Sequence, residues 1–366
     1  MMTGNFCAEK KRLVCGPMAT ISHPAFRILI EKFGGCDEYF TEMINAGSLL
    51  NDGPFEKFYV NPEPVPQKIV WQLTGSDAAR IAEAARRLVE YPGLGLDINM
   101  GCSAPDIYRT GAGIGWMLCP IEKTRQMIRD VASVVSGHNR HSPGFEKRFS
   151  VKLRLGDDDF TPDGFLAFCD MLVEEGVRLL TLHPRTKKEK LSRPPRYEWC
   201  QALAQRYARA DSSGGVTVYL NGNVRDAQSA ANAADLCPMC GGIMISRAAV
   251  QKPWIFKEIR EAGGSSEQKN QDGSCRADDA GGAIKKNQSV DMLALCLEYI
   301  DLVEKYQPEA FYRTRLQRFF TYFCDNFKFA HYARTQFLNA RDNSDLRLRI
   351  AEFFEKCPEE RMRQVP

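Results

Sequence analysis

The sequence lacks the features that mark membrane and secreted proteins. No run of about 18 apolar residues occurs, and the stretch from Met1 to Arg12 has no apolar core of a signal peptide. The 13 cysteines show no framework spacing, which favours reduced thiols over a disulfide-stabilised scaffold. A net charge of +3 is too small to indicate a nucleic-acid partner by itself. We therefore expect a cytoplasmic protein that is not bound to a membrane.

The chain alternates short apolar strands with amphipathic helices. Its 366 residues, 44% of them hydrophobic, can bury one full-sized core and leave room for a smaller second domain. The eight predicted strands are Arg12–Cys15, Glu38–Thr41, Lys68–Leu73, Gly95–Asn99, Ser150–Arg154, Leu179–His183, Thr217–Asn221 and Gly242–Ile245. Helices are predicted between them, for example over Asp77–Tyr91, Pro120–Val135, Pro162–Glu175 and Arg225–Ala234. This alternation predicts the α/β class and a (β/α)8 TIM barrel.

The composition changes after residue 261. Residues 262–289 are rich in Gly, Ser, Asn, Gln and mixed charge, and such a segment buries too little apolar surface to order itself. Helical periodicity returns from Val290 and continues to Phe354. We therefore predict a catalytic barrel over residues 1–261, a disordered linker or insertion over 262–289, and a C-terminal all-helical domain over 290–366.

Residues that can carry chemistry follow nearly every predicted strand. They are Pro17, Met18 and Ala19 after the first, Glu42 after the second, Gln72 at the end of the third, Asn99 and Cys102 after the fourth, Lys152 in the fifth, His183 at the end of the sixth, Asn221, Gly222 and Asn223 after the seventh, and Ser246 and Arg247 after the eighth. Each alone has a structural explanation, such as a turn or a satisfied core histidine. Together they predict an active site, because this fold builds its sites from the loops at the C-terminal face.

The same positions suggest a ligand. Small residues with backbone amides and Arg247 follow the last two strands, where this fold commonly binds a phosphate. Lys152 and Gln72, in the barrel mouth, could form hydrogen bonds with the carbonyl-rich edge of a flavin.

One strand delivers a single cysteine on a polar turn, in the run Asp97-Ile-Asn-Met-Gly-Cys102. Gly101 allows the backbone to pass close to a ligand, and the glycines up to Gly115 predict a mobile loop over a pocket. A buried structural cysteine is the common alternative. No histidine lies beside Cys102 in the sequence, so a Cys-His hydrolase has no positive support.

These segments closely resemble the dihydrouridine synthases, flavin enzymes that reduce uracil rings in RNA. The matching segments are Gly16-Pro-Met-Ala19, Pro24-Ala-Phe-Arg27, Phe40-Thr-Glu-Met43, Gln72, Asp97-Ile-Asn-Met-Gly-Cys102, Val151-Lys-Leu-Arg-Leu-Gly156, His183-Pro-Arg-Thr186, Asn221-Gly-Asn223, Met244-Ile-Ser-Arg-Ala-Ala249 and Pro253-Trp-Ile-Phe256. The resemblance implies FMN held by Pro17, Met18, Ala19, Gln72, Lys152, His183, Asn221, Gly222, Asn223, Ser246 and Arg247. It also implies that Cys102 donates a proton and that Asn99 helps to hold the uracil.

The implied chemistry suits a cysteine. Because the uracil C5=C6 bond is conjugated to the C4 carbonyl, a reduced flavin can pass hydride to C6, and C5 must then be protonated from the opposite face. A thiol with an ordinary pKa of about 8.5 is mostly protonated near neutral pH and can serve as that acid. Three residues depart from the family pattern, namely Ser103, Asp106 and Ser246. They put the identity of the substrate nucleotide in doubt rather than the core reaction.

Two basic regions are candidates for RNA contact. The first is His183 to Arg196, which follows the sixth strand on the catalytic face and includes Arg185, Lys187 and Lys188. The second is Lys305 to Arg349 in the helical domain, where basic residues are interleaved with aromatic ones. Most of these aromatics are expected in the core because they recur at helical spacing. The arginines Arg313, Arg315 and Arg318 are then the predicted RNA contacts.

Two further patterns are given structural interpretations. Cys237-Pro-Met-Cys240 has the spacing of half a zinc or redox site, but no second such pair exists, so no metal is expected. Residues His138, Arg140, His141, Lys147 and Arg148 are expected to form a solvated basic loop before the fifth barrel strand, on the face opposite the site.

The sequence therefore predicts an FMN-dependent RNA dihydrouridine synthase that uses NADPH or NADH as reductant. RNA is the expected partner, transfer RNA in the first place with ribosomal RNA open, and no obligate protein partner is evident. Two rivals remain. A flavin oxidoreductase of a free small molecule, like a dihydroorotate or enoate reductase, would not need the basic helical tail. A non-catalytic RNA-binding protein would need neither FMN nor Cys102.

Overall fold

The computed structural model describes residues 11–157, 161–189, 193–208, 215–267 and 288–365. These residues fall into two compact units. The first comprises the described parts of Met1–Ser22, Asp37–Val224 and Asn232–Ile245, and the second those of His23–Cys36, Arg225–Ala231 and Ser246–Pro366.

The first unit is built on a closed parallel barrel. Its eight strands are β1 (Arg12–Cys15), β2 (Glu38–Phe40), β4 (Ile69–Thr74), β5 (Gly95–Met100), β6 (Arg148–Leu153), β7 (Leu179–Leu182), β8 (Thr217–Asn221) and β9 (Gly242–Ile245). Every neighbouring pair is parallel, and the pairings β9 to β1, β1 to β2 and β2 to β4 close the ring, with the short β3 (Ile44–Asn45) added beside β4. The predicted (β/α)8 barrel is confirmed.

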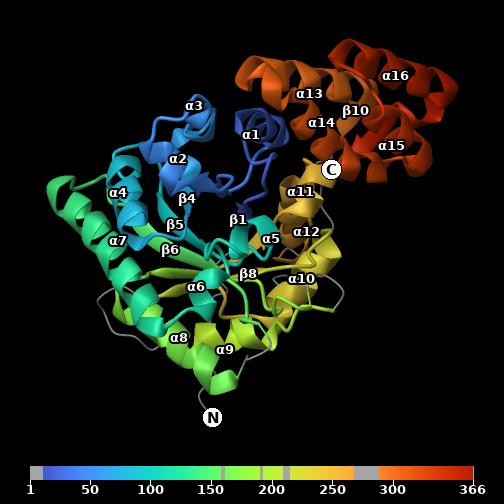
Figure 1. Cartoon of the computed structure of the whole chain (residues 1–366). Coiled ribbons are helices and arrows are strands. Elements are labelled where there is room, and N and C mark those ends of the chain that lie inside the picture. Colours follow the sequence, from blue (N-terminus) through green and yellow to red (C-terminus); the bar gives the residue numbers. More distant parts are fainter. Residues whose placement is uncertain (1–10, 158–160, 190–192, 209–214, 268–287, 366) are drawn as a thin grey trace, which may run out of the picture. The chain divides into compact units, whose positions relative to one another are not determined.

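Helices surround these strands on the outside (Figure 1). Those of the first unit are α2 (Ala46–Leu50), α3 (Glu56–Tyr59), α4 (Ala78–Leu88), α5 (Pro105–Tyr108), α6 (Gly115–Leu118), α7 (Ile121–His141), α8 (Pro162–Glu174) and α9 (Glu198–Tyr207). Local sequence explains where two of them begin. Asp77 caps the start of α4, because its side chain accepts a hydrogen bond from the Arg80 backbone amide at 2.9 Å. Thr161 caps α8 in the same way, accepting from the Gly164 amide at 3.2 Å.

The predicted basic loop before the fifth barrel strand is wrong in part. Residues His138 to His141 form the last turn of α7, and Arg148 begins β6. The helix runs beyond the predicted end at Val135 because its last turn is fastened to the following segment. Asn139 donates to the Lys147 carbonyl at 2.9 Å and accepts the Lys147 amide at 2.7 Å.

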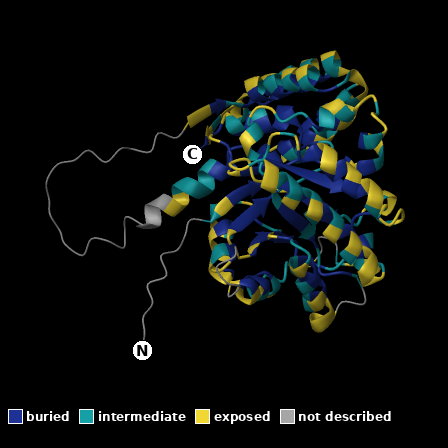
Figure 2. Cartoon of the chain, turned by 90° about the vertical axis from the view of Figure 1, so that its left-hand side faces the viewer, coloured by how far each residue is buried: buried dark blue, intermediate teal, exposed yellow. Residues whose placement is uncertain are grey.

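The barrel interior is layered, and Figure 2 shows how the strands are buried while the outer helices carry the exposed faces. An apolar layer fills the middle, made of Val14, Phe40, Val70, Leu179, Tyr219 and Met244. Each such side chain contributes about 1.5–3 kcal/mol when fully buried. An ionic cluster around Glu38 lies towards the strand N-termini, and buried polar side chains lie towards the C-termini. The polar groups at the N-terminal end are thus bonded to one another around Glu38, whereas those at the C-terminal end line the side of the barrel where this fold builds its sites.

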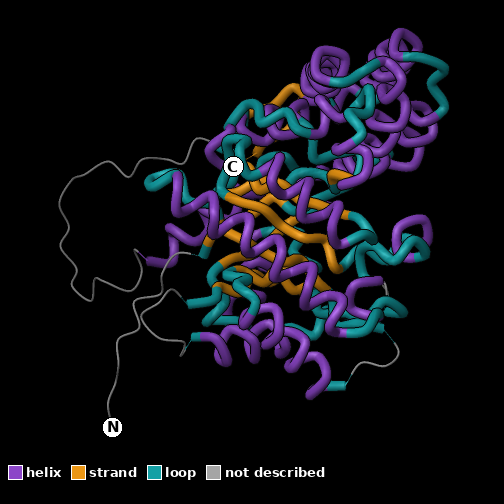
Figure 3. The backbone as a smooth tube through the Cα atoms, turned by 60° about the vertical axis from the view of Figure 1, so that its left-hand side comes forward, coloured by secondary structure: helices purple, strands orange, loops and turns teal. Residues whose placement is uncertain are grey.

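The second unit is mostly helical. Its elements are α1 (Pro24–Glu31), part of α10 (Ala227–Leu236), α11 (Arg247–Gln251), α12 (Ile255–Glu267), α13 (Met292–Tyr306), α14 (Glu309–Phe323), α15 (Ala330–Leu338), α16 (Asn343–Lys356) and the antiparallel pair β10 (Gln288–Asp291) and β11 (Met362–Val365). Aromatic side chains form its core. The rings of Tyr299 and Phe319 are stacked with their centroids 3.7 Å apart, and the centroids of Phe327 and Phe353 are 5.1 Å apart. Figure 3 distinguishes these helices from the strands.

The predicted C-terminal helical region is present, but the second unit is broader than residues 290–366, since α1 packs against α13 within it. The disordered linker predicted over 262–289 is wrong at both edges. Residues 262–267 complete α12, and residues 288 and 289 begin β10, whose pairing with β11 supplies order that composition does not reveal. The remainder of that segment lies outside the described residues. Within the described ranges, no helix is long and apolar enough to cross a membrane.

Candidate active site

The predicted site residues of the first unit lie at the C-terminal ends of the barrel strands. Gln72 is in β4, Asn99 in β5, Lys152 in β6 and Asn221 ends β8, while Cys102 follows β5. Pro17, Met18 and Ala19 follow β1, His183 follows β7, and Gly222 and Asn223 follow β8. Because all these strands are parallel, their C-terminal ends face the same opening of the barrel.

A chain of hydrogen bonds crosses three strands beneath this opening. Ser150 Oγ donates to Asp97 Oδ1 at 2.6 Å, and Gln72 Nε2 donates to Asp97 Oδ2 at 2.8 Å. Asn99 Nδ2 then donates to Gln72 Oε1 at 2.9 Å. All four side chains are buried. Gln72 and Asn99, predicted as contacts to flavin and uracil, are therefore also bonded to each other.

The same chain of bonds ends at the cysteine. Asn99 Oδ1 accepts the backbone amides of Cys102 at 2.9 Å and of Gly101 at 3.2 Å. Arg154 Nε donates to the Gly101 carbonyl at 3.0 Å, and the Ile114 amide donates to the Cys102 carbonyl at 3.0 Å. The turn is thus fixed on both sides, while the Cys102 side chain stays partly exposed.

The segment after Cys102 returns to its own start. Gly113 has a positive φ of 59°, and a Cβ atom there would lie 2.6 Å from the Cys102 carbonyl oxygen. Trp116 Nε1 donates to the Gly75 carbonyl at 2.8 Å, which fastens this segment to the loop after β4. The predicted loop therefore carries α5 and closes beside the cysteine.

Lys152 is a largely buried cation in β6 at the mouth of the barrel. Its strand position pairs with Asn99 in β5 and Thr181 in β7, and among the described residues its ammonium has no hydrogen bond or ion pair. Burial, helped by the charge of Arg154, lowers the pKa of Lys152 to about 8 against the attraction of Asp97 and Cys102. A group in this state gains most from a ligand that offers hydrogen-bond acceptors.

Asp97 carries the opposite shift. Burial raises the pKa of its carboxyl to about 6, although hydrogen bonds from Ser150 and Gln72 and the charges of Lys152 and Arg148 favour the ionised form. The Asp97 carboxyl is therefore a buried hydrogen-bond acceptor, and its hydrogen bonds and the nearby positive charges offset only part of the cost of burying its negative charge.

Glycine is required on the opposite side of the mouth. At Gly222, with φ of 121°, a Cβ atom would lie 2.9 Å from the His183 ring and 3.2 Å from the Arg185 guanidinium. Tyr197 donates its hydroxyl to the Gly222 carbonyl, and Asn221 Nδ2 donates to the Met244 carbonyl at 2.8 Å. The turn after β8 thus presents bare backbone beside His183.

Ser246 and Arg247 belong to the second unit. Ser246 precedes α11, and the Arg247 side chain is exposed, with no hydrogen bond or ion pair among the residues that the structure describes. Their predicted contact with a phosphate stays a prediction.

The structure changes the set of RNA-contact candidates on the barrel. Arg185 is only 2% exposed, because Nε donates to the Arg193 carbonyl at 2.6 Å and Nη1 lies 2.7 Å from His183 Nε2. Its predicted phosphate contact on the surface is wrong in this structure. Lys187 bonds Asp157 at 2.5 Å and lies 4.3 Å from the Tyr108 ring centre, whereas Lys188 is exposed.

One arginine of α14 is also misassigned. Arg315 is 1% exposed and lies over the Phe311 ring at 4.9 Å, so its predicted RNA contact is wrong. Arg313 and Arg318 are exposed, the latter 5.7 Å from the Tyr322 ring centre. These two remain candidates.

Three residues with clear roles in the geometry were not assigned from sequence. Asp97, Ser150 and Arg154 lie within or beside segments that carry the resemblance, but only the strand register shows what they contact. Asp97 is directly paired with Gln72 on one side and Ser150 on the other. A buried acid in an apolar strand was the available signal.

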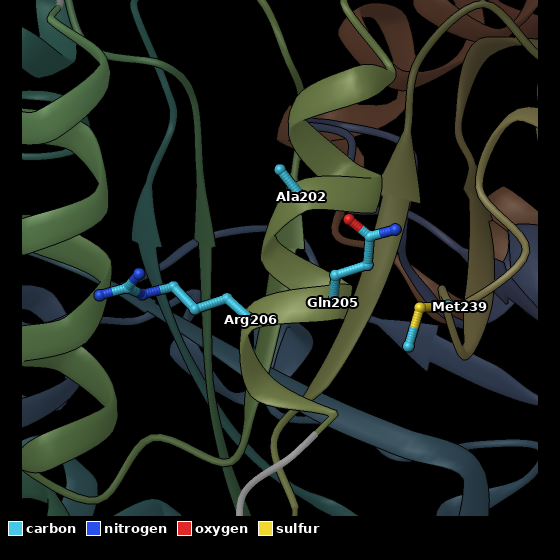
Figure 4. Close-up of a pocket in the computed structure, with 4 residues that line it drawn as sticks. All are labelled: Ala202, Gln205, Arg206 and Met239. Carbon is cyan, nitrogen blue, oxygen red and sulfur yellow. The ribbon is translucent and has the colours of Figure 1, made fainter.

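Two other features lie away from this opening. A surface hollow lined by Ala202, Gln205, Arg206 and Met239 lies at the end of α9 and before β9, so it belongs to the N-terminal side of the barrel (Figure 4). Cys237 and Cys240 are buried, and among the described residues no group of three or more potential metal ligands occurs.

Comparison with known proteins agrees with this geometry. Residues 13–345 match the family model described as Dihydrouridine synthase. The chain is 31% identical over 256 residues to the probable tRNA-dihydrouridine synthase of Aquifex aeolicus (strain VF5), covering 69% of this chain and 74% of that protein. It is 25% identical over 362 residues to the probable tRNA-dihydrouridine synthase 2 of Bacillus subtilis (strain 168), covering 97% and 98%. The second match includes the helical C-terminal region.

Proposed function

Because this chain belongs to the dihydrouridine synthase family, we propose that it reduces specific uridines in tRNA to 5,6-dihydrouridine with a flavin cofactor. The observation that carries the proposal is the turn at Cys102. One thiol, whose backbone is held by Asn99 and Arg154, stands at the mouth of a barrel near the largely buried cation of Lys152. A proton donor and a site for an electron-rich ring edge are thus adjacent.

Family membership implies a flavin, and we propose that it is FMN. The residues present fit such a group, since Lys152 has no hydrogen-bond acceptor within the described part of the chain and the turn at Gly222 has room only for bare backbone. Lys152, Gln72 and His183 would hold the ring system, with Pro17, Met18 and Ala19 beside it. Asn221, Gly222 and Asn223 would hold the phosphate-bearing chain, and the contacts of Ser246 and Arg247 with the phosphate stay a prediction from the sequence. When bound and reduced, FMN supplies hydride to C6 of the uracil, with NADPH or NADH as the source of electrons.

The protein's own contribution is the proton. After hydride addition at C6, charge accumulates at C5 and on the C4 oxygen, and a thiol on the opposite face of the ring can protonate C5. Cys102 supplies that proton, and Asn99 and Arg154 keep its backbone in place. A positioned acid of this kind contributes about 10²–10⁴ in rate.

Flavin affinity is expected to fall as pH rises through about 8. Below that pH the free Lys152 is an ammonium ion, which a flavin acceptor stabilises; above it, binding must first restore the proton. Lys152→Met should weaken FMN binding at neutral pH by roughly tenfold or more and remove the pH dependence. Lys152→Arg keeps a permanent charge and should bind FMN independently of pH. Equilibrium titration of the FMN-free protein between about pH 7 and pH 9.5 measures this. The same pH profile in Lys152→Met would contradict the assignment.

The exposed arginines of α14 are expected to contribute affinity for RNA. Turning a uracil out of a folded RNA costs a few kcal/mol, which a single base pocket has little surplus to offset. Replacing Arg313 and Arg318 by Gln should raise the Michaelis constant for tRNA and lower the slope of log affinity against log salt by about one for each lost phosphate contact. Flavin content and nicotinamide oxidation should not change.

Matched controls keep this test specific. Arg86→Gln with Arg140→Gln removes two exposed charges at the ends of α4 and α7, on the N-terminal side of the barrel, and should leave the salt slope unchanged. An unchanged slope in the Arg313 and Arg318 variant would show that RNA does not lie on this part of α14.

Direct assay decides the function itself. The FMN-loaded protein with NADPH or NADH should convert uridine to dihydrouridine in tRNA that lacks the modification, as read by nucleoside mass spectrometry. Turnover of free uridine or another small molecule at rates above those with tRNA would favour a small-molecule oxidoreductase. Binding of tRNA without flavin or turnover would indicate a non-catalytic RNA-binding protein.

A further inference from the structure

The hydrogen bonds beneath the mouth have a fixed direction. A carboxylate only accepts, and a side-chain amide has one accepting and one donating end. Asp97 Oδ2 therefore accepts a hydrogen bond from Gln72 Nε2. The other end of the same amide, Gln72 Oε1, is then left to accept a hydrogen bond from Asn99 Nδ2. Asn99 Oδ1 is then the atom that faces the amides of Gly101 and Cys102.

Reversal of either amide would place like groups together. With Gln72 turned over, its Oε1 would face the Asp97 carboxylate, and with Asn99 turned over, its Nδ2 would face two backbone N–H groups. An unpaired buried donor or acceptor costs about 1–3 kcal/mol. The four residues are buried, with Gln72, Asp97 and Ser150 at 0% and Asn99 at 7% exposure, so water does not readily replace a lost partner.

We propose that Asp97 is a positioning residue for the proton donor, acting through Gln72 and Asn99 to hold the backbone turn that presents the Cys102 thiol. This inference rests on the proposed function for the role of Cys102 as an acid, but the structural coupling can be measured without substrate. Asp97 itself lies two hydrogen-bonded side chains away from the turn. Its influence on the reaction is therefore indirect.

Ser150 provides a matched control. It bonds the other oxygen of Asp97 and plays no part in the path towards Asn99. Removal of its hydroxyl perturbs the same buried carboxylate without interrupting the path to the turn. Asp97→Asn provides the second control, because its side-chain oxygen can still accept Gln72 Nε2 while its amide donates to Ser150 Oγ.

The first measurement is amide hydrogen exchange at Gly101 and Cys102 in the full-length FMN-loaded protein. Asp97→Leu removes the acceptor for Gln72 and should speed exchange at both amides at least about tenfold. Ser150→Ala and Asp97→Asn should stay within about twofold of wild type. Equal acceleration in Ser150→Ala would mean that the barrel is loosened generally, which would overturn the proposal. Wild-type exchange in Asp97→Leu would do the same.

A second pair of variants keeps the test valid if Asp97→Leu folds poorly. Gln72→Met interrupts the same path at its next member with nearly conserved volume. Since members of one hydrogen-bond network are coupled, Asp97→Leu combined with Gln72→Met should accelerate exchange no more than the larger single effect. Multiplied effects would show that the two residues act independently of each other and would refute the relay.

The catalytic consequence is tested separately. In Asp97→Leu, kcat for tRNA reduction should fall at least about tenfold, whereas the Michaelis constant for tRNA and the rate of flavin reduction by nicotinamide should remain near wild type. Asp97→Asn should restore kcat. If exchange changes as expected but the wild-type protein does not reduce tRNA, the proposed function fails while the structural relay stands. If the wild-type protein reduces tRNA, and Asp97→Leu speeds amide exchange without lowering kcat, the proposed function stands and only the positioning role of Asp97 is refuted.

Discussion

Cys102→Ala is expected to abolish tRNA reduction while leaving flavin binding and flavin reduction intact. The thiol is the group proposed to protonate C5, and nothing else in the turn replaces it, since the backbone amides of Gly101 and Cys102 are already bonded to Asn99. Loss of a positioned general acid lowers the rate by about 10²–10⁴. Rapid mixing of the reduced variant with tRNA, followed by the flavin absorbance, measures this step directly.

Cys119→Ala is the matched control. Cys119 is also partly exposed and lies in the same long segment after β5, but its Sγ contacts Thr124 Oγ1 at 3.2 Å and it has no part in the turn. In this variant, tRNA should reoxidise the reduced flavin at the wild-type rate. Wild-type reoxidation in Cys102→Ala would rule out the assigned role of the thiol.

The barrel and its mouth could be predicted because their signals are local. Short apolar runs alternate with helices, and a parallel barrel brings the ends of all its strands to one opening. Polar residues at those ends, such as Lys152 and Asn221, therefore had to lie on the same face of the barrel. The interior hydrogen bonds could not be predicted in this way. Asp97 meets Gln72 and Ser150 only because the three positions share one register.

The two misassigned arginines failed for different reasons. Arg315 was grouped with Arg313 and Arg318 by charge, although its helical position relative to the buried Leu316, Phe319 and Phe323 places it on the core side of α14. Helical phase could have excluded it. Arg185 lies in a loop, where no periodicity applies, and its burial follows from long-range contacts with His183 and the Arg193 carbonyl. Counting basic residues locates a charged segment but does not show which side chains reach solvent.

The order of the chain also concealed the two units. Sequence favours a barrel that ends before a separate tail, whereas α1, directly after β1, packs against α13. Its apolar residues look like those of any barrel helix. Whether the apolar residues of α1 pack on the barrel or on α13 depends on a contact between segments far apart in sequence. The pattern of residues within α1 does not reveal that contact.

Glu38→Gln is expected to destabilise the barrel by about 3 kcal/mol at neutral pH. The Glu38 side chain is fully buried and accepts from Arg148 at 3.0 and 2.5 Å, from Arg12 at 3.0 Å and from Tyr219 at 2.8 Å. Neutralising it leaves the Arg148 guanidinium without its carboxylate, and Arg148 is too enclosed for water to replace that partner fully. The free energy of unfolding from urea titration, followed by the fluorescence of the buried Trp71 and Trp116, measures the loss.

The dependence of this loss on pH distinguishes a broken ion pair from a packing defect. The hydrogen bonds and charge of Arg148 hold the pKa of Glu38 below its ordinary value despite burial, so the folded protein binds that proton less readily than the unfolded chain. The stabilisation is then complete above about pH 4.5 and is lost as pH falls through the lower pKa of the folded state. The difference between wild type and Glu38→Gln should shrink in acid. Arg12→Gln, whose side chain is 57% exposed, should cost less than about 1 kcal/mol at any pH. A loss in Glu38→Gln that is constant down to pH 3 would show that shape, and not charge, makes Glu38 necessary.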